Sequence, residues 1–152
     1  METNTDLNIN DEQSLSKYEQ LLAQQLFSIL ITSVPGSDKV ITGLNIENLL
    51  KFMQYEVDML NEEIVIASIL LQRFFQKQES KGVQVVKVKN IGTILIVVFI
   101  LAMKLCRDDS YRNKTIANMF KIPSETINQS ELGFLRMIDF DLNVEYGFFD
   151  RD

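Results

Sequence analysis

The sequence predicts an all-α fold, in which a bundle of five helices is built around one of them, a buried central helix, and one further amphipathic helix precedes the bundle. Apolar residues recur at spacings of three and four in most segments, which is the period of an amphipathic helix. One segment, 91–103, is apolar on nearly every side, as expected for a helix enclosed by others. Only six glycines and two prolines interrupt the 152 residues, so the helices can be long.

The N-terminal part predicts a tail followed by a helix. Residues 1–12 are acidic and Asn-rich with few aliphatic side chains, so we expect a disordered tail. Residues 13–36 form the predicted N-terminal helix, which Pro35 and Gly36 end. Its apolar stripe consists of Leu15, Tyr18, Leu22, Leu26, Ile29 and Leu30.

Two further helices are predicted at 46–60 and 62–78. Asn45 and Asn61 are the candidate caps, because an Asn side chain accepts a free backbone N–H at a helix start. The first carries Ile46, Leu49, Leu50, Met53, Val57 and Leu60 on one face, and the second carries Ile64, Val65, Ala67, Ser68, Leu71 and Phe74. Glu62 and Glu63 suit the positive end of the second helix dipole.

Residues 79–89 predict an extended connector, with a short strand as the alternative. The segment contains Gly82 and a loose alternation of valines. It also forms, with Lys77, the basic stretch of the chain: Lys77, Lys81, Lys87 and Lys89 beside the lone acid Glu79. We interpret these charges as those of a solvated loop.

The apolar segment 91–103 predicts the buried central helix. At 13 residues it is shorter than the roughly 20 residues that a hydrocarbon core requires, so we expect no membrane span. A short helix at 113–121 follows, and Pro123 then opens a last helix to about 139, with Ile127, Phe134, Leu135 and Ile138 facing inward. Residues 143–152 are expected to be a C-terminal tail packed through Phe148 or Phe149.

The composition excludes several classes of function. The net charge of −6 argues against nucleic-acid binding, which depends on clustered Lys and Arg. The chain has no His and a single Cys, Cys106, so the usual zinc ligands and the usual general base are missing and we expect no metal, no cofactor and no enzymatic activity. A lone Cys and no apolar leader favour a cytoplasmic or nuclear protein.

Three blocks in this order resemble the cyclin family. They are EEIVIASILLQRFF at 62–75, AMKLCRDDSYRNKTIANMF at 102–120 and PSETINQSELGFLRMIDFDLNV at 123–144. The resemblance implies a single cyclin box at 45–142. Within the first block, Gln72 stands where the family pattern has Asp before Arg73 and Phe74.

The string from Asp108 to Asn113 is similar to that of the P-type (phosphate-pathway, also called U-type) and cyclin Y branches. A single box fits these branches. The chain lacks the second box and the Met-Arg-Ala-Ile-Leu docking patch of cell-cycle cyclins, so the resemblance does not carry over substrate recruitment by that patch.

The resemblance implies a regulatory subunit that binds and activates a cyclin-dependent protein kinase. It assigns kinase contacts to Lys104 and Glu131, which hydrogen-bond to the kinase main chain beside its C-helix, and to Leu101 and Leu135. We expect a monomer before kinase binding. Binding would favour the inward position of the C-helix, in which the Lys–Glu ion pair and the magnesium-binding loop of the kinase are aligned.

The same residues have plainer interpretations. Lys104 suits the C-terminal end of a helix dipole and forms an i,i+4 pair of opposite sign with Asp108. Asp108 and Asp109 would cap the next turn rather than bind a metal, because further oxygen ligands at defined spacing are missing. Cys106 is expected in the core. Glu131, among apolar neighbours, is expected to need a partner for its charge.

Three rival functions remain open. A transcription-factor relative of the cyclin fold would need a basic DNA-binding face, which the acidic balance disfavours. A degenerate cyclin box would act as a helical scaffold that docks a non-kinase partner. An enzyme is disfavoured because no nucleophile, base and phosphate-binding loop can be assembled from the sequence.

Overall fold

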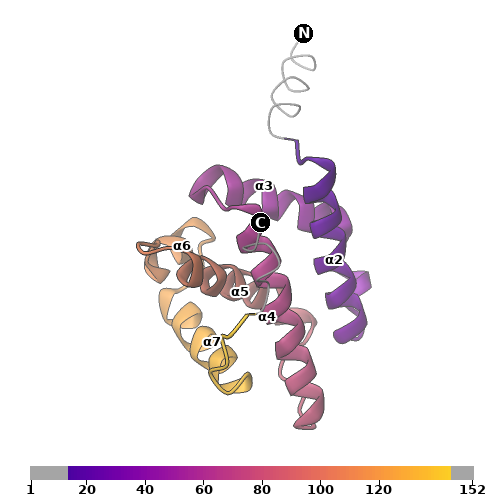
Figure 1. The fold of residues 1–152 in the computed structure, drawn as a ribbon. Coiled ribbons are helices and arrows are strands. Elements are labelled where there is room, and N and C mark those ends of the chain that lie inside the picture. The colour runs from indigo at the N-terminus through magenta and orange to yellow at the C-terminus, as the bar shows by residue number, and fades with distance from the viewer. Residues whose placement is uncertain (1–13, 145–152) are drawn as a thin grey trace. The chain divides into compact units, whose positions relative to one another are not determined.

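The computed structural model describes residues 14–144. The predicted tail at 1–12 and the tail residues from 145 onward, with Phe148 and Phe149, lie outside this range. The described residues form six α-helices and two short 3₁₀-helices, with no strand among them, and the predicted all-α fold is confirmed (Figure 1). They divide into two compact units, 14–61 and 62–144, and the predicted box at 45–142 spans the division.

The first unit contains α2 (Lys17–Ser33), η1 (Ser37–Lys39) and α3 (Gly43–Val57). A capping box starts α2, because the Ser16 hydroxyl accepts from the Glu19 N–H at 3.1 Å and the Ser16 N–H donates to Glu19 at 2.8 Å. Partial burial raises the pKa of Glu19, but hydrogen bonds from the Ser16 backbone and the Gln54 side chain outweigh it, and the pKa is lowered.

The predicted cap of α3 is wrong by three residues. Thr42, not Asn45, is the N-cap: its hydroxyl accepts from the Asn45 N–H at 3.1 Å, and the Asn45 side chain accepts from the Thr42 N–H at 2.9 Å. Both residue types cap helices well, and the reciprocal pair satisfies two N–H groups where a single Asn cap would satisfy one.

The second unit contains α4 (Asn61–Ser80), η2 (Val88–Asn90), α5 (Ile91–Cys106), α6 (Asn113–Met119) and α7 (Ser124–Met137). Between α4 and η2 the chain forms a turn at Lys81 and Gly82 and then has no regular secondary structure, so the alternative of a short strand is not observed there. The buried Gln78 side chain holds it there, because its oxygen accepts from the N–H groups of Val85 and Val86 at 2.8 and 3.0 Å. A buried side-chain acceptor thus replaces the strand partner that this segment lacks.

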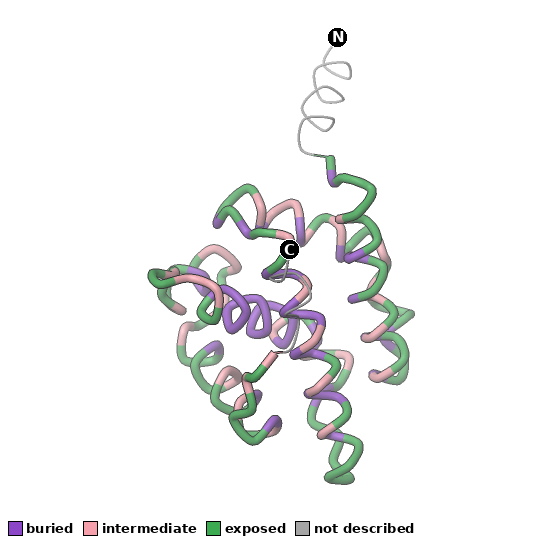
Figure 2. The backbone as a smooth tube through the Cα atoms, viewed as in Figure 1, coloured by how far each residue is buried: buried purple, intermediate pink, exposed green. Residues whose placement is uncertain are grey.

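Helix α5 is the core of the second unit. Eleven of its sixteen residues are buried, and Figure 2 shows this helix as the longest buried stretch of the tube. In Figure 1, α7 lies beside α5, and Ile127, Phe134 and Ile138 of the α7 segment are buried. The prediction of a buried central helix is confirmed.

The length argument made for this helix is wrong. The 3₁₀ turn η2 leads directly into α5, and α5 continues three residues past Met103, so the helical run Val88–Cys106 has 19 residues. By length and composition this run could cross a membrane. Most of it is buried inside the protein, as is typical of the core helix of a bundle.

Candidate functional site

Lys104 and Glu131 come together at the surface of the second unit. Lys104 lies in the last turn of α5, where the helix dipole favours a cation, and Glu131 lies in the middle of α7. The Lys104 Nζ atom is 2.8 Å from Glu131 Oε2. The Lys104 side chain is 40% exposed and that of Glu131 is 14% exposed, so the pair is half open to solvent rather than sealed inside.

Helix α6 holds the other oxygen of Glu131. The Asn113 side-chain amide donates to Glu131 Oε1 at 2.8 Å and to Asn128 Oδ1 at 2.9 Å. The carboxylate therefore receives a hydrogen bond on each oxygen, one from α5 and one from α6. This fixes its orientation, as the largely buried position of the acid requires.

This arrangement leaves hydrogen-bonding capacity for a partner. A lysine ammonium has three donors and only one is used here, while a carboxylate oxygen can accept more than one hydrogen bond. The surface can thus offer donors and acceptors, a few ångströms apart, to the main-chain groups of another protein.

A buried ion pair fixes the end of α5 next to this site. Arg107, the C-cap residue that follows α5, donates from Nε and Nη2 to the two oxygens of Glu63 at 2.7 and 2.8 Å. The Glu63 side chain is fully buried in the first turn of α4. The expectation that Glu63 would merely complement the α4 dipole missed this partner, which lies 44 residues away in the sequence.

Three cations hold the segment that follows α7: Arg73 and Lys77 lie in α4, and Lys81 directly follows it. Asp139 pairs with Lys77 at 3.3 Å and with Lys81 at 2.9 Å, and Arg73 donates to the Asp141 carbonyl at 2.8 Å. Hydrogen bonds from Lys81 and Lys77 lower the pKa of Asp139. Lys77 and Lys81 are therefore not merely solvated charges.

Two interpretations of the Asp108 region are wrong. Lys104 does not form an i,i+4 pair with Asp108, because α5 ends at Cys106 and Arg107 is already extended. No side chain caps α6, whose N-cap residue is Arg112. Within residues 14–144 no group of acids, His or Cys is arranged to hold a metal ion.

The two leucines predicted as kinase contacts differ in burial, and Leu135, which was also predicted to face inward, is not fully buried. Leu101 is only 4% exposed, so a partner could reach little of it, whereas Leu135 is half-buried and more accessible. The kinase contacts of both residues stay a prediction. Among the apolar side chains of α5, α7 and the described residues that follow α7, those of Leu105, Leu132 and Phe140 are exposed, at 42%, 42% and 58%. Sequence reasoning missed these three. Leu132 could have been found, because it falls off the inward stripe of Ile127, Phe134 and Ile138.

Cys106 is only partly buried, not a full core residue. Burial raises the pKa of its thiol to about 11, and the negative charges of Glu63 and Glu62 add to this effect. The thiol is therefore a poor nucleophile at neutral pH.

Comparison with known protein families identifies the family of the chain. The family model described as Cyclin matches residues 5–142, which include α2 to α7 and both members of the Lys104–Glu131 pair. The chain belongs to the cyclin family. The resemblance carried by the three sequence blocks is confirmed.

The curated relatives of this cyclin are U-type cyclins of Arabidopsis thaliana. Cyclin-U2-1 is 28% identical over 86 residues, Cyclin-U2-2 is 29% identical over 86, and Cyclin-U4-3 is 33% identical over 87. Each match covers 57% of this chain and between 36% and 38% of the relative. The assignment to the U-type branch is supported. No solved structure matches the chain.

Proposed function

We propose that this cyclin is the regulatory subunit of a cyclin-dependent protein kinase, which it binds and activates. The observation that carries the proposal is the Lys104–Glu131 pair, because an ammonium and a carboxylate from two helices meet at 2.8 Å on the surface of a cyclin-family chain. We expect the chain to act in the cytoplasm or nucleus and to be a monomer before the kinase binds.

The pair suits the end of a helix in the partner. Helix ends carry backbone N–H and C=O groups without intrahelical partners, and charge-assisted hydrogen bonds to such groups are stronger than neutral ones. Lys104 would donate to a kinase carbonyl and Glu131 would accept from a kinase N–H. Leu105 and Leu132, each next to a member of the pair in sequence and both 42% exposed, would add apolar contact.

Activation would be a shift of population. A surface that binds only the inward position of the kinase C-helix increases the share of kinase molecules in that position. The ion pair between the kinase lysine and its C-helix glutamate then forms, and the phosphoryl-transfer site is complete. In this proposal all the chemistry belongs to the kinase.

The test is affinity purification of the full chain from native cells, followed by a protein kinase assay on the recovered complex. The proposal predicts a cyclin-dependent kinase in the complex and kinase activity above that of the kinase alone. Recovery of a stable partner that is not a kinase would instead support a scaffold function. Recovery of the kinase without a gain in activity would limit the function to binding.

A further inference from the structure

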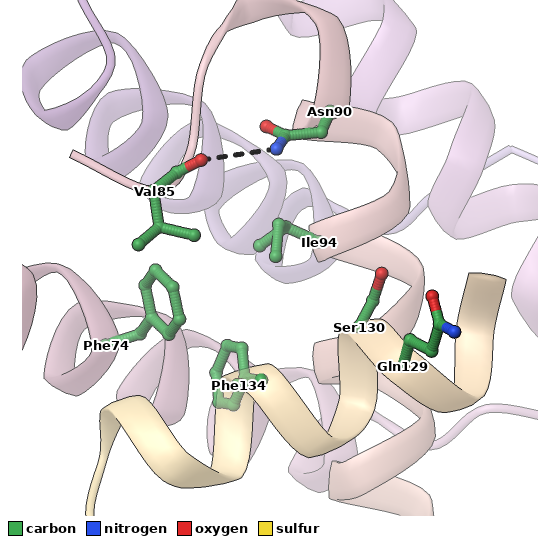
Figure 3. Close-up of a pocket in the computed structure, with 8 residues that line it drawn as sticks. Phe74, Val85, Asn90, Ile94, Gln129, Ser130 and Phe134 are labelled. Carbon is green, nitrogen blue, oxygen red and sulfur yellow. Dashed lines mark hydrogen bonds between the residues drawn. The ribbon is translucent and has the colours of Figure 1, made fainter.

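A second candidate binding feature lies along the edge of α7 that is turned toward α4. A cavity of about 230 Å³ lies among α4, the extended connector, the start of α5 and α7 (Figure 3). Its lining consists of Phe74, Val85, Asn90, Ile94, Gln129, Ser130, Gly133 and Phe134. Small-molecule sites in proteins usually exceed about 300 Å³, so this cavity suits a single large side chain better than a cofactor.

The floor of the cavity is apolar and buried. Phe74 and Phe134 are stacked with ring centroids 4.7 Å apart and an angle of 22° between their planes. Ile94 is 6% exposed and completes the floor, while Val85 at the side is 48% exposed and opens the cavity to solvent. An inserted apolar side chain would thus meet preformed aromatic and aliphatic surfaces, at little cost in ordering them.

Gly133 has no structural reason to be glycine. It lies inside α7, where glycine costs about 1 kcal/mol relative to alanine. A Cβ atom added to Gly133 would meet no atom within 4 Å, so packing does not exclude a side chain. Because Gly133 has no side chain, the cavity stays open on the side of α7 and has space for a side chain of a binding partner.

The wall also has an unused polar group. The Ser130 hydroxyl has no hydrogen-bond partner among residues 14–144, and Figure 3 shows it on the cavity side of α7. The neighbouring Gln129 donates to Glu125 at 3.2 Å, and the Asn90 amide donates to the Val85 carbonyl at 3.3 Å. A guest that carries a backbone carbonyl or N–H group could therefore pair with Ser130.

The connector beside the cavity is basic. Lys87 and Lys89 lie between the lining residues Val85 and Asn90 in sequence and are exposed. Neither forms an ion pair with a residue of the described range, whereas Lys77 and Lys81 are paired with Asp139. In a chain of net charge −6, two unpaired lysines next to an apolar cavity favour a guest that carries carboxylates.

We propose that this cavity is a docking site for a short acidic segment of a partner protein, which inserts one large apolar side chain between α4 and α7. The carboxylates of the segment pair with Lys87 and Lys89, and its backbone pairs with Ser130. The cavity shares α7 with the proposed kinase contact but not the same face: Gly133 is two positions after Glu131, which is about 200° around the helix axis.

The experiment measures fluorescence anisotropy of dye-labelled peptides titrated with the full chain. The probe is a peptide with one phenylalanine between glutamates. Matched peptides replace the phenylalanine by alanine or the glutamates by lysines. Removing the inserted ring should weaken binding by roughly tenfold to a hundredfold. Reversing the peptide charges should abolish binding, and high salt should weaken it.

Variants of the chain separate the cavity from the rest of the surface. Gly133→Leu fills the cavity and should abolish peptide binding, while Gly43→Leu, the same change at a glycine of α3 with open space around it, should not alter it. Lys87→Glu with Lys89→Glu should reduce binding strongly, and Lys17→Glu with Lys39→Glu, an equal change of charge elsewhere, should not. Gly133→Ala should raise the melting temperature yet weaken binding.

Three results would overturn the proposal. The first is absence of binding by any acidic peptide to the unaltered chain. The second is binding that Gly133→Leu leaves unchanged. The third is self-association of the chain that Gly133→Leu removes, because the guest would then be a second copy. Kinase recovery is expected to survive Gly133→Leu, so failure here leaves the proposed function standing.

Discussion

Two ion pairs lie three residues apart at the end of α5, and they differ in burial and in the number of hydrogen bonds that join them. Lys104–Glu131 joins α5 to α7 with the lysine 40% exposed, whereas Arg107–Glu63 joins the end of α5 to α4 with the glutamate fully buried. The first has donors to spare for a partner, while the second is bidentate and its glutamate is closed to solvent.

The difference in burial indicates that Arg107–Glu63 stabilises the fold, whereas Lys104–Glu131 is accessible to a binding partner. Removing one member of a buried pair leaves a charge in an apolar surrounding and is strongly destabilising. Removing one member of a half-exposed pair lets water replace it, and little stability is lost. Loss of the buried pair should therefore mainly lower the stability of the fold. Loss of the exposed pair should mainly lower the affinity for a partner.

The largest expected effect on stability is that of Arg107→Ala. It strands the Glu63 carboxylate in the core and should lower the free energy of unfolding by about 3–5 kcal/mol. Urea denaturation followed by circular dichroism measures it. Arg112→Ala, at an exposed arginine of the next loop, should stay within about 0.5 kcal/mol of the parent. An unchanged urea midpoint of unfolding for Arg107→Ala would show that the buried pair does not stabilise the fold more than the exposed pair does.

Lys104→Ala should have a small effect on stability and a large effect on kinase affinity. Because the pair is half exposed, the loss of unfolding free energy should not exceed about 1 kcal/mol. Kinase affinity should nevertheless fall by roughly tenfold or more, since a charge-assisted hydrogen bond to the partner is lost. Denaturation and a binding titration on the same preparation give both values. Equal effects of Lys104→Ala and Arg107→Ala on stability would contradict the distinction.

A smaller effect, which depends on pH, is expected at Asp139. Its pKa is lowered in the folded chain, so the stability gained from Lys81 and Lys77 is complete above the ordinary pKa of 3.8 and is lost as pH falls through the folded pKa. The difference in melting temperature between the parent and Asp139→Asn should therefore be constant near neutral pH and shrink below pH 3.8. Asp38→Asn, at an exposed aspartate of η1, is the control. A difference that grew on acidification would have the wrong sign.

The smallest expected effect concerns reactivity alone. With its pKa raised to about 11 from 9.0, Cys106 should react with iodoacetamide at pH 8 roughly a hundredfold more slowly in the folded chain than in urea. Mass spectrometry of timed samples measures the rate. Equal reaction rates in the folded chain and in urea would contradict the raised pKa.

The fold could be predicted from sequence because its signals are local. Apolar spacing and helix-breaking residues gave six helices with bounds off by a few residues, and the apolar stretch at 91–103 marked the core. Caps were harder, since Thr42 and Asn45 are both good capping residues and only the backbone decides between them.

The site could be predicted only where the family resemblance named its residues. Lys104 and Glu131 were expected together, and the structure brings them together. Glu63–Arg107 and the Asp139 contacts of Lys77 and Lys81 were missed, because each joins residues more than 40 positions apart and no local pattern marks such a pair. Gly133 carried a signal that was overlooked: a glycine inside a helix with no turn to make.

The central claim is that the exposed pair binds the main chain of a kinase. Its most direct test is the exchange of both charges, Lys104→Glu with Glu131→Lys, in a titration against the purified kinase. The exchanged side chains can still pair with each other, so the helical circular dichroism should be unchanged. Kinase affinity should fall by roughly a hundredfold or more, because donor and acceptor are reversed toward the partner. Unchanged kinase affinity in the folded double variant would contradict the account.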